Sequence, residues 1–218
     1  MTPLPRALDP VEMRILGALL EKAQTTPDYY PLTVSALVAA CNQKSNREPV
    51  MELGQDDVLD GLESLRRDVL AWRSEGARSE RWSEGVTRRL HLEPPARAVL
   101  TLLLLRGPQT AGELRARSDR MASFGSLDEV HDVLAELATR AEPVVVELAR
   151  RPGQKETRWA HLLGGEPSEE TGDAPAADYE STARPVTASR SALEDRLAAL
   201  EDRIESLEAE LAELRGSR

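Results

Sequence analysis

The chain of 218 residues contains little sulfur and few aromatic rings. It has one cysteine, Cys41, so it can form neither an intrachain disulfide nor a cluster of cysteine metal ligands. With one Phe, three Trp and three Tyr, its core must consist mainly of aliphatic side chains. Such cysteine usage is typical of a reducing compartment, which favours the cytoplasm.

Long hydrophobic runs are also missing. The longest apolar-rich run, residues 98–105, is far shorter than the roughly 20 residues that a membrane-spanning helix needs. Residues 1–6 contain no apolar stretch of the kind found in signal peptides. We therefore expect a soluble cytoplasmic protein that has no membrane partner.

The net charge of −10 is concentrated at one end of the chain. Residues 1–92 carry 12 Lys and Arg against 14 Asp and Glu, and residues 93–163 carry 10 of each kind. Residues 164–218 carry 6 basic and 14 acidic side chains. Neither of the first two segments is the strongly basic body that is typical of a nucleic-acid-binding domain.

Three helices and a hairpin are expected in residues 8–92. Asp9 and Pro10 form a helix start, and Thr33 or Ser35 can cap a second helix. A third helix is predicted over residues 56–70, and the turn-rich region 72–92 predicts a β-hairpin wing. The buried stripe predicted for the third helix is Val58, Leu59, Leu62, Leu65 and Val69.

The same order of elements recurs in residues 93–163. Thr110 and Leu114 match Thr33 and Leu37, and an apolar helix precedes them as in the first segment. Two β-rich runs, 144–149 and 157–162, flank a Pro-Gly turn and predict a second hairpin. Helix, helix, helix and hairpin, occurring twice, is the order of a winged helix. We predict a mainly α fold with small β-wings (α+β), built from tandem winged helix-turn-helix domains at 8–92 and 93–163.

The remaining residues predict a linker and a coiled coil. Residues 164–189 have almost no apolar side chains and predict a disordered acidic linker. Residues 190–216 carry a heptad seam, and the charges beside it favour a parallel homodimer. The residues expected to form the dimer seam are Leu193, Leu197, Leu200, Ile204, Leu207, Leu211 and Leu214.

Together these residues resemble the YceH-type family of bacterial proteins, over roughly residues 8–163. The resemblance implies tandem winged helices, and it brings no assigned biochemical role, catalytic residue or ligand. The segments that carry it are 16–22, 25–27, 30–32, 40–44, 46–50, 103–107, 109–110, 112–115 and 151–153.

A polar loop at residues 42–49 has two interpretations. In the first, Gln43, Lys44, Asn46 and Arg47 present hydrogen-bond donors to phosphates or base edges. In the second, Asn42 caps the second helix and Arg47 pairs internally with an acid such as Glu48 or Glu12. Both interpretations stay open on the sequence alone.

Other basic side chains gather in the predicted wings and after the second segment's middle helix. They could track phosphates without reading sequence, or they could form an ordinary solubilising surface. The third helices argue against major-groove reading, because both begin with acidic residues. These candidate contact residues are Arg78, Arg81, Arg88, Arg89, Arg115, Arg117, Arg150, Arg151, Lys155 and Arg158.

Enzyme chemistry finds little support in the sequence. The histidines His91, His131 and His161 lack metal-ligand spacing, and Cys41 suits a small buried position. No phosphate-binding glycine loop or nucleophile elbow is found. We expect no catalytic residue, no metal and no cofactor.

Two functional hypotheses follow. The leading one is a non-enzymatic nucleic-acid-associated or regulatory protein that binds duplex DNA through its wings and the 42–49 loop. The alternative is a protein–protein adaptor in which the paired winged helices form a docking surface.

Overall fold

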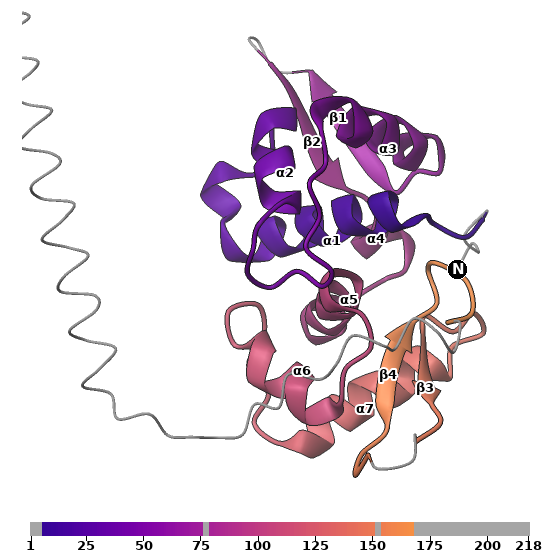
Figure 1. Cartoon of the computed structure of the whole chain (residues 1–218). Helices are drawn as coiled ribbons and strands as arrows, with labels where there is room; N and C mark the ends of the chain where they lie inside the picture. Colours follow the sequence, from indigo (N-terminus) through magenta and orange to yellow (C-terminus); the bar gives the residue numbers. More distant parts are fainter. Residues whose placement is uncertain (1–5, 76–78, 151–153, 168–218) are drawn as a thin grey trace, which may run out of the picture. The chain divides into compact units, whose positions relative to one another are not determined.

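The computed structural model describes residues 6–75, 79–150 and 154–167 (Figure 1). This part of the chain is rich in helix and carries two small antiparallel hairpins, which confirms the predicted mainly α class. None of its helices is long and apolar enough to cross a membrane. The predicted linker beyond residue 167 and the predicted coiled coil, with its seam of leucines, lie outside the described residues.

The first three helices and the first hairpin follow the predicted order. They are α1 (Pro10–Thr25), α2 (Val34–Cys41), α3 (Gln55–Arg67), β1 (Ala71–Glu75) and β2 (Glu80–Glu84), with a short 3₁₀ turn, η1 (Pro27–Tyr29), after α1. A second series comes after a one-turn helix, α4 (Val86–Arg89). It consists of α5 (Pro94–Arg106), α6 (Ala111–Ser118), α7 (Leu127–Ala138), β3 (Val145–Leu148) and β4 (Arg158–His161).

Local capping fixes where the helices begin. Asp9 accepts a hydrogen bond from the Glu12 amide at 2.8 Å, and the Glu12 carboxylate accepts one from the Asp9 amide at 2.9 Å. Thr33 caps α2 and Thr110 caps α6 through their hydroxyl groups. These side chains satisfy amides that the first turn of a helix leaves without partners.

Each hairpin is joined to the residue that precedes a threonine cap. Leu32 and Trp82 exchange two backbone hydrogen bonds, of 3.0 and 2.7 Å. Gln109 and Trp159 exchange an equivalent pair of 3.0 and 2.7 Å. Both pairs therefore place the second strand of a hairpin beside the start of a middle helix.

The first hairpin is shorter than the sequence predicted. The alternation in residues 88–92 indicated a strand, but β2 ends at Glu84 and Arg88 and Arg89 lie in or at the end of α4. The Gly85 amide donates to the Leu70 carbonyl at 2.7 Å and closes the hairpin. Val86 and Leu90, four residues apart, are then buried on one side of a helical turn.

The third helix also ends earlier than predicted, at Arg67. Val69 was expected in its buried stripe, but it has a φ of 61° and its side chain is 43% exposed. The chain turns at this residue so that Leu70 can enter the core and β1 can begin. The other four residues of the predicted stripe lie on the inner side of α3 or at its margin.

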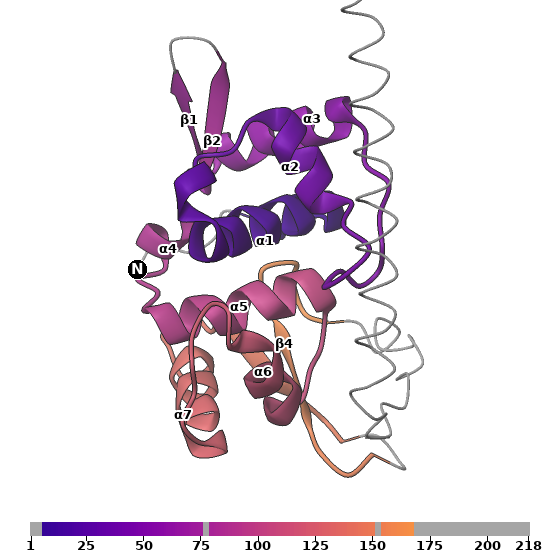
Figure 2. The same ribbon diagram turned by 90° about the vertical axis from the view of Figure 1, so that its left-hand side faces the viewer.

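The two series share one hydrophobic core, because α1 packs along α5 (Figure 2). Gln24 of α1 donates to the Thr101 hydroxyl of α5 at 3.0 Å. The residues before α1 also meet the residues after β4, since the Leu8 amide donates to the Leu163 carbonyl at 2.8 Å. The division at residues 92 and 93 into two separate domains stays a prediction.

Gly17 permits the close approach of α1 to α5. A Cβ atom at this position would lie 2.8 Å from Leu105 Cδ2 and 3.1 Å from Leu104 Cβ. We expect Gly17→Val to lower the free energy of unfolding by about 1–3 kcal/mol, because the packed core cannot take the added volume. Denaturant unfolding followed by circular dichroism measures the change.

Gly112→Ala is the matched control. Gly112 lies on α6, and a Cβ there would have its nearest neighbour at 3.8 Å. Replacing a helical glycine at an open position is expected to be neutral or slightly stabilising. Equal losses in the two variants would contradict the proposed role of Gly17 in helix packing.

Candidate interaction surface

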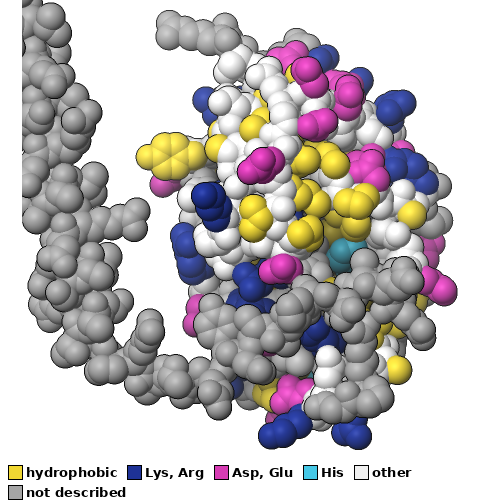
Figure 3. Space-filling view, viewed as in Figure 1, with side chains coloured by type: hydrophobic (Ala, Val, Ile, Leu, Met, Phe, Trp, Pro, Cys, Tyr) yellow, Lys and Arg dark blue, Asp and Glu magenta, His cyan; other side chains and the backbone are white. Residues whose placement is uncertain are grey.

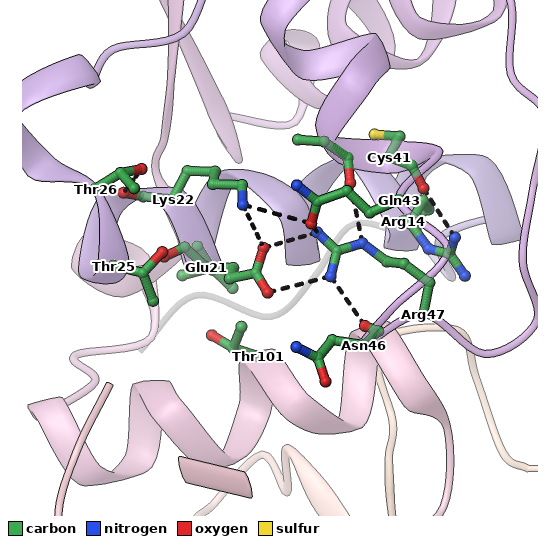
Figure 4. A network of polar contacts seen from close by, with 12 residues as sticks. Arg14, Glu21, Lys22, Thr25, Thr26, Cys41, Gln43, Asn46, Arg47 and Thr101 are labelled. Carbon is green, nitrogen blue, oxygen red and sulfur yellow. Dashed lines mark hydrogen bonds and ion pairs between the residues drawn. The ribbon is translucent and has the colours of Figure 1, made fainter. Parts of the chain in front are cut away.

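Segment 42–54 joins α2 to α3 and lies against α1, and a buried polar network beneath it fixes its path (Figure 4). The network combines charged side chains of α1 with side chains and carbonyls of the segment. Charged groups are rarely buried unless they are paired and hydrogen-bonded. The network therefore shows what holds the segment and which of its side chains are left to face outward.

Arg47 is the centre of this network and is only 2% exposed. Its guanidinium donates to the two carboxylate oxygens of Glu21 at 3.1 and 2.7 Å. The same group donates to the carbonyls of Ala40 and Asn46 and to the Gln43 side chain. A guanidinium suits this position because its planar array of donors matches a carboxylate and several carbonyls at once.

Arg14 makes a second tie between α1 and the segment. It is 2% exposed and donates to the carbonyl of Cys41 at 3.1 Å and to that of Pro49 at 2.5 Å. Burial and the neighbouring charge of Arg47 lower the pKa of Arg14. Cys41 ends α2, so its carbonyl has no partner within the helix, and Arg14 supplies a donor to it in a buried position.

Two further sets of hydrogen bonds fix the backbone of the segment. The side chain of Asn42 donates to the Leu53 carbonyl and accepts from the Leu53 amide, both at 2.8 Å. The Glu48 amide donates to the Leu105 carbonyl of α5 at 2.8 Å. The segment is therefore anchored at both ends and in the middle, to the helices of both series.

Glu21 stays ionised in this setting. Burial alone would raise the pKa of Glu21, but the hydrogen bonds and charge of Arg47, helped by Lys22, lower it. Glu12 behaves in the same way, because hydrogen bonds from Arg6 and the Asp9 amide outweigh burial and lower its pKa to about 2. Both carboxylates thus stabilise the fold in their charged form.

The structure decides between the two interpretations for Arg47 itself. Arg47 pairs internally, although its partner is Glu21 and neither Glu48 nor Glu12, since Glu12 binds Arg6. Gln43 is half-buried and accepts from Arg47, whereas Lys44 and Asn46 are exposed. Contact with a partner stays a prediction for the exposed residues, and Arg47 supports their loop from beneath.

The outward side of segment 42–54 is apolar in the middle and acidic towards α3. Val50 is 53% exposed, and Met51 and Leu53 are half-buried beside it. Glu52 is exposed, as are Asp56 and others on the first turns of α3. Figure 3 shows hydrophobic side chains gathered near the middle of this face with acidic side chains above them.

The basic side chains predicted as contacts are scattered, and several make internal bonds. Arg81 donates to the Pro31 carbonyl and Arg89 to the Asp68 carbonyl. Arg115 donates to the carbonyls of Phe124 and Gly125. Arg117 and Arg158 both lie within ion-pair distance of Glu113, at 3.3 and 3.8 Å. The exposed members of the set are Arg81, Arg88, Arg115, Arg150 and Lys155, while Arg78 and Arg151 lie outside the described residues.

The side chains with potential for catalysis or metal binding lie apart. Within the ranges that the structure describes, no group of three or more His, Cys, Asp and Glu could hold a metal ion. Cys41 is buried, and burial raises the pKa of its thiol to about 12. Burial likewise lowers the pKa of His161 to about 4, whereas His91 and His131 are exposed.

Sequence reasoning missed the α1 side of this network. Arg14 and Glu21 occupy helical positions that look like ordinary polar residues, and their partners lie more than twenty residues away. One signal was present, because Arg14 and Glu21 interrupt or border the apolar face Ile15–Leu20 of α1. A charge beside a fully buried helix face indicates that a buried partner is needed.

The bond between Arg47 and Glu21 yields a stability prediction. Arg47→Met removes one member of a buried pair and leaves the Glu21 carboxylate without its main partner. We expect the free energy of unfolding to fall by about 3–5 kcal/mol in urea denaturation. The control is Arg66→Met, because the pair between Arg66 and Glu63 is exposed on both sides and contributes about 0–1 kcal/mol. Similar losses in the two variants would show that Arg47 does not anchor the segment.

The lowered pKa of Glu21 yields a second prediction. Its unfolded value is near 4.5 and its folded value is lower, so its stabilisation is fully present above pH 4.5. The contribution is lost as the pH falls below 4.5 through the folded pKa. We therefore expect the stability difference between the wild type and Glu21→Gln to shrink below pH 4.5. Unfolding free energies at pH 7, 4.5 and 3 measure it, and a difference that stays constant would contradict the assignment.

Comparison with known proteins places the chain in a family. The family model described as "Protein of unknown function, DUF480" matches residues 8–154. The UPF0502 protein of Geobacter metallireducens is 52% identical over 164 residues, which cover 75% of each chain. The UPF0502 protein of Burkholderia orbicola is 49% identical over 168 residues, covering 76% of this chain and 71% of the relative. These matches confirm the family predicted from the sequence, and the chain belongs to the DUF480 family of bacterial proteins.

Proposed function

We propose that this chain is a non-enzymatic tandem winged-helix protein whose partner is another protein rather than duplex DNA. The repeat supports the first part of the proposal. Each series has three helices, a hairpin, and a two-bond bridge between the second strand and the residue before the middle helix. In each series this isolated bridge extends the two-stranded hairpin to the start of the middle helix, which is compatible with a winged helix.

The negative charge at the start of both third helices is the observation that favours a protein partner over duplex DNA. In helix-turn-helix proteins that read DNA, the N-terminal residues of the recognition helix contact base edges between two rows of phosphates. Here both third helices begin with exposed carboxylates, which phosphates would repel. These exposed residues are Asp56, Asp57 and Asp60 on α3 and Asp128, Glu129 and Asp132 on α7.

The basic side chains do not compensate for this arrangement. Arg47 is buried against Glu21, and Arg117 and Arg158 share Glu113. A protein that binds DNA through its phosphates gains affinity from each cation that displaces a counterion. Cations that already neutralise internal carboxylates contribute little to such binding.

The non-enzymatic part of the proposal has its own support. The one thiol, Cys41, is buried and protonated, so it is a poor nucleophile. The His161 imidazole is neutral at pH 7 and lies in β4 of the second hairpin. Homodimerisation through a parallel coiled coil at residues 190–216 also stays a proposal, and it is carried by the heptad pattern alone.

Binding of the full chain to a fluorescent generic 20-base-pair duplex tests the choice of partner. We expect no measurable binding at either 50 or 200 mM salt. A DNA-binding winged helix that neutralises six to ten phosphates would bind at low salt and lose about 10³–10⁵-fold in affinity over this range. Such a steep dependence would overturn the proposal in favour of the nucleic-acid hypothesis.

A second arm tests for the protein partner directly. The tagged chain is purified from nuclease-treated cells of its own source organism and washed at 500 mM salt. A partner retained in fixed stoichiometry supports the proposal. A partner that is lost after nuclease treatment would show that nucleic acid bridges the two.

A further inference from the structure

The apolar middle of segment 42–54 is unusual because it is rigid and yet exposed. Val50 lies between Pro49, whose carbonyl accepts from Arg14, and Leu53, whose amide and carbonyl both bind Asn42. Its side chain is nevertheless 53% exposed. The segment's own fold therefore gains little from this valine, while a ligand would meet an apolar group already held in place. Such pre-organisation lowers the entropy cost of binding.

Neighbouring apolar side chains extend the surface. Met51 and Leu53 of the same segment are half-buried. Leu53 packs against the hydrophobic core, so its outer atoms are supported from beneath. We call Val50, Met51 and Leu53 the Val50 face.

Carboxylates border the Val50 face on the side of α3. Glu52, Asp56 and Asp60 are exposed. In the part of the chain that the structure describes, none of the three lies within 4.0 Å of a Lys or Arg nitrogen in an ion pair. The side of the rim towards α3 is therefore negative, and its carboxylates are not neutralised from within as Glu21 and Glu12 are.

We propose that the Val50 face docks a basic segment of a partner protein, one that inserts apolar side chains between Lys or Arg residues. The apolar middle provides the buried centre of such an interface, and the carboxylates select and orient a positive rim. This proposal rests on the proposed function and specifies the chemistry of the partner. Charge also argues against a second copy of the same face, because a two-fold contact would bring these carboxylates against their own copies.

A synthetic amphipathic helical peptide of Leu and Lys is the probe, and its Leu and Glu counterpart is the reference. Fluorescence anisotropy with the full chain measures both affinities. We expect the Lys peptide to bind and Val50→Ser to weaken it by about tenfold, since the apolar contact is lost. Asp56→Asn combined with Asp60→Asn is expected to weaken binding at low salt more than at high salt.

Matched variants separate this surface from general attraction to an acidic chain. Tyr29→Ser removes an apolar side chain that is 76% exposed on η1, and Asp132→Asn removes an exposed carboxylate of α7. Both are expected to leave the affinity unchanged. Equal effects of Val50→Ser and Tyr29→Ser, or equal binding of the Glu peptide, would overturn the proposal. Val50 is exposed, so unfolding midpoints of the variant and the wild type should agree and exclude a folding defect.

The remaining outcomes distinguish this proposal from the proposed function. A partner that is retained equally by the wild type and Val50→Ser after nuclease treatment would leave the adaptor function standing and refute the Val50 face. A change in solution mass caused by Val50→Ser would show a contact between copies and would also refute it. Salt-dependent binding of duplex DNA, by contrast, would remove the proposed function itself.

Discussion

The bidentate contact between Arg47 and Glu21 is the constraint on which the candidate surface depends. A charged pair in a dry interior is costly to assemble, and it adds stability only when the remaining donors and acceptors are also satisfied. Here the carbonyls of Ala40 and Asn46 and the amide of Gln43 complete the arrangement. The same atoms that balance the charge thereby fix the backbone of a connection that would otherwise be a loose loop.

As a consequence, some residues of segment 42–54 hold its backbone in place and others are exposed to solvent. Residues that point inward, such as Asn42 and Arg47, secure the path, while Lys44, Val50 and Glu52 face solvent. The supports come from α1 and α5 together, since Arg14 and Glu21 belong to the first and Leu105 to the second. The surface thus depends on contacts with helices of both series.

Local signals in the sequence predicted the elements well. Asp9, Thr33 and Thr110 each cap a helix through atoms only a few residues away, so the sequence carries the whole interaction. The second hairpin was also predicted, because its β-branched run and its turn are adjacent. The first hairpin was extended too far, because residues 88–92 fit a strand and a helical turn equally, and the bond from Gly85 to Leu70 decides between them.

Contacts between residues far apart in the sequence could not be predicted from such local signals. That Arg47 would be buried was one of two open alternatives, but its partner was misassigned, because Glu21 lies on a different helix. The close packing at Gly17 depends on α5 in the same way. The Val50 face was not predicted at all, since exposure of an apolar residue becomes visible only when its neighbours have been placed.

The hydrogen bond between Leu8 and Leu163 has a consequence for biosynthesis. Helix α1 leaves the ribosome before α5 and β4, and both Leu8 and Leu163 are almost fully covered in the finished fold. The entry to α1 therefore receives its final cover only when the strand after the second hairpin turn has been translated. Until then Leu8 at the entry to α1 stays uncovered in the nascent chain, and a ribosome that stalls before Leu163 would leave it so.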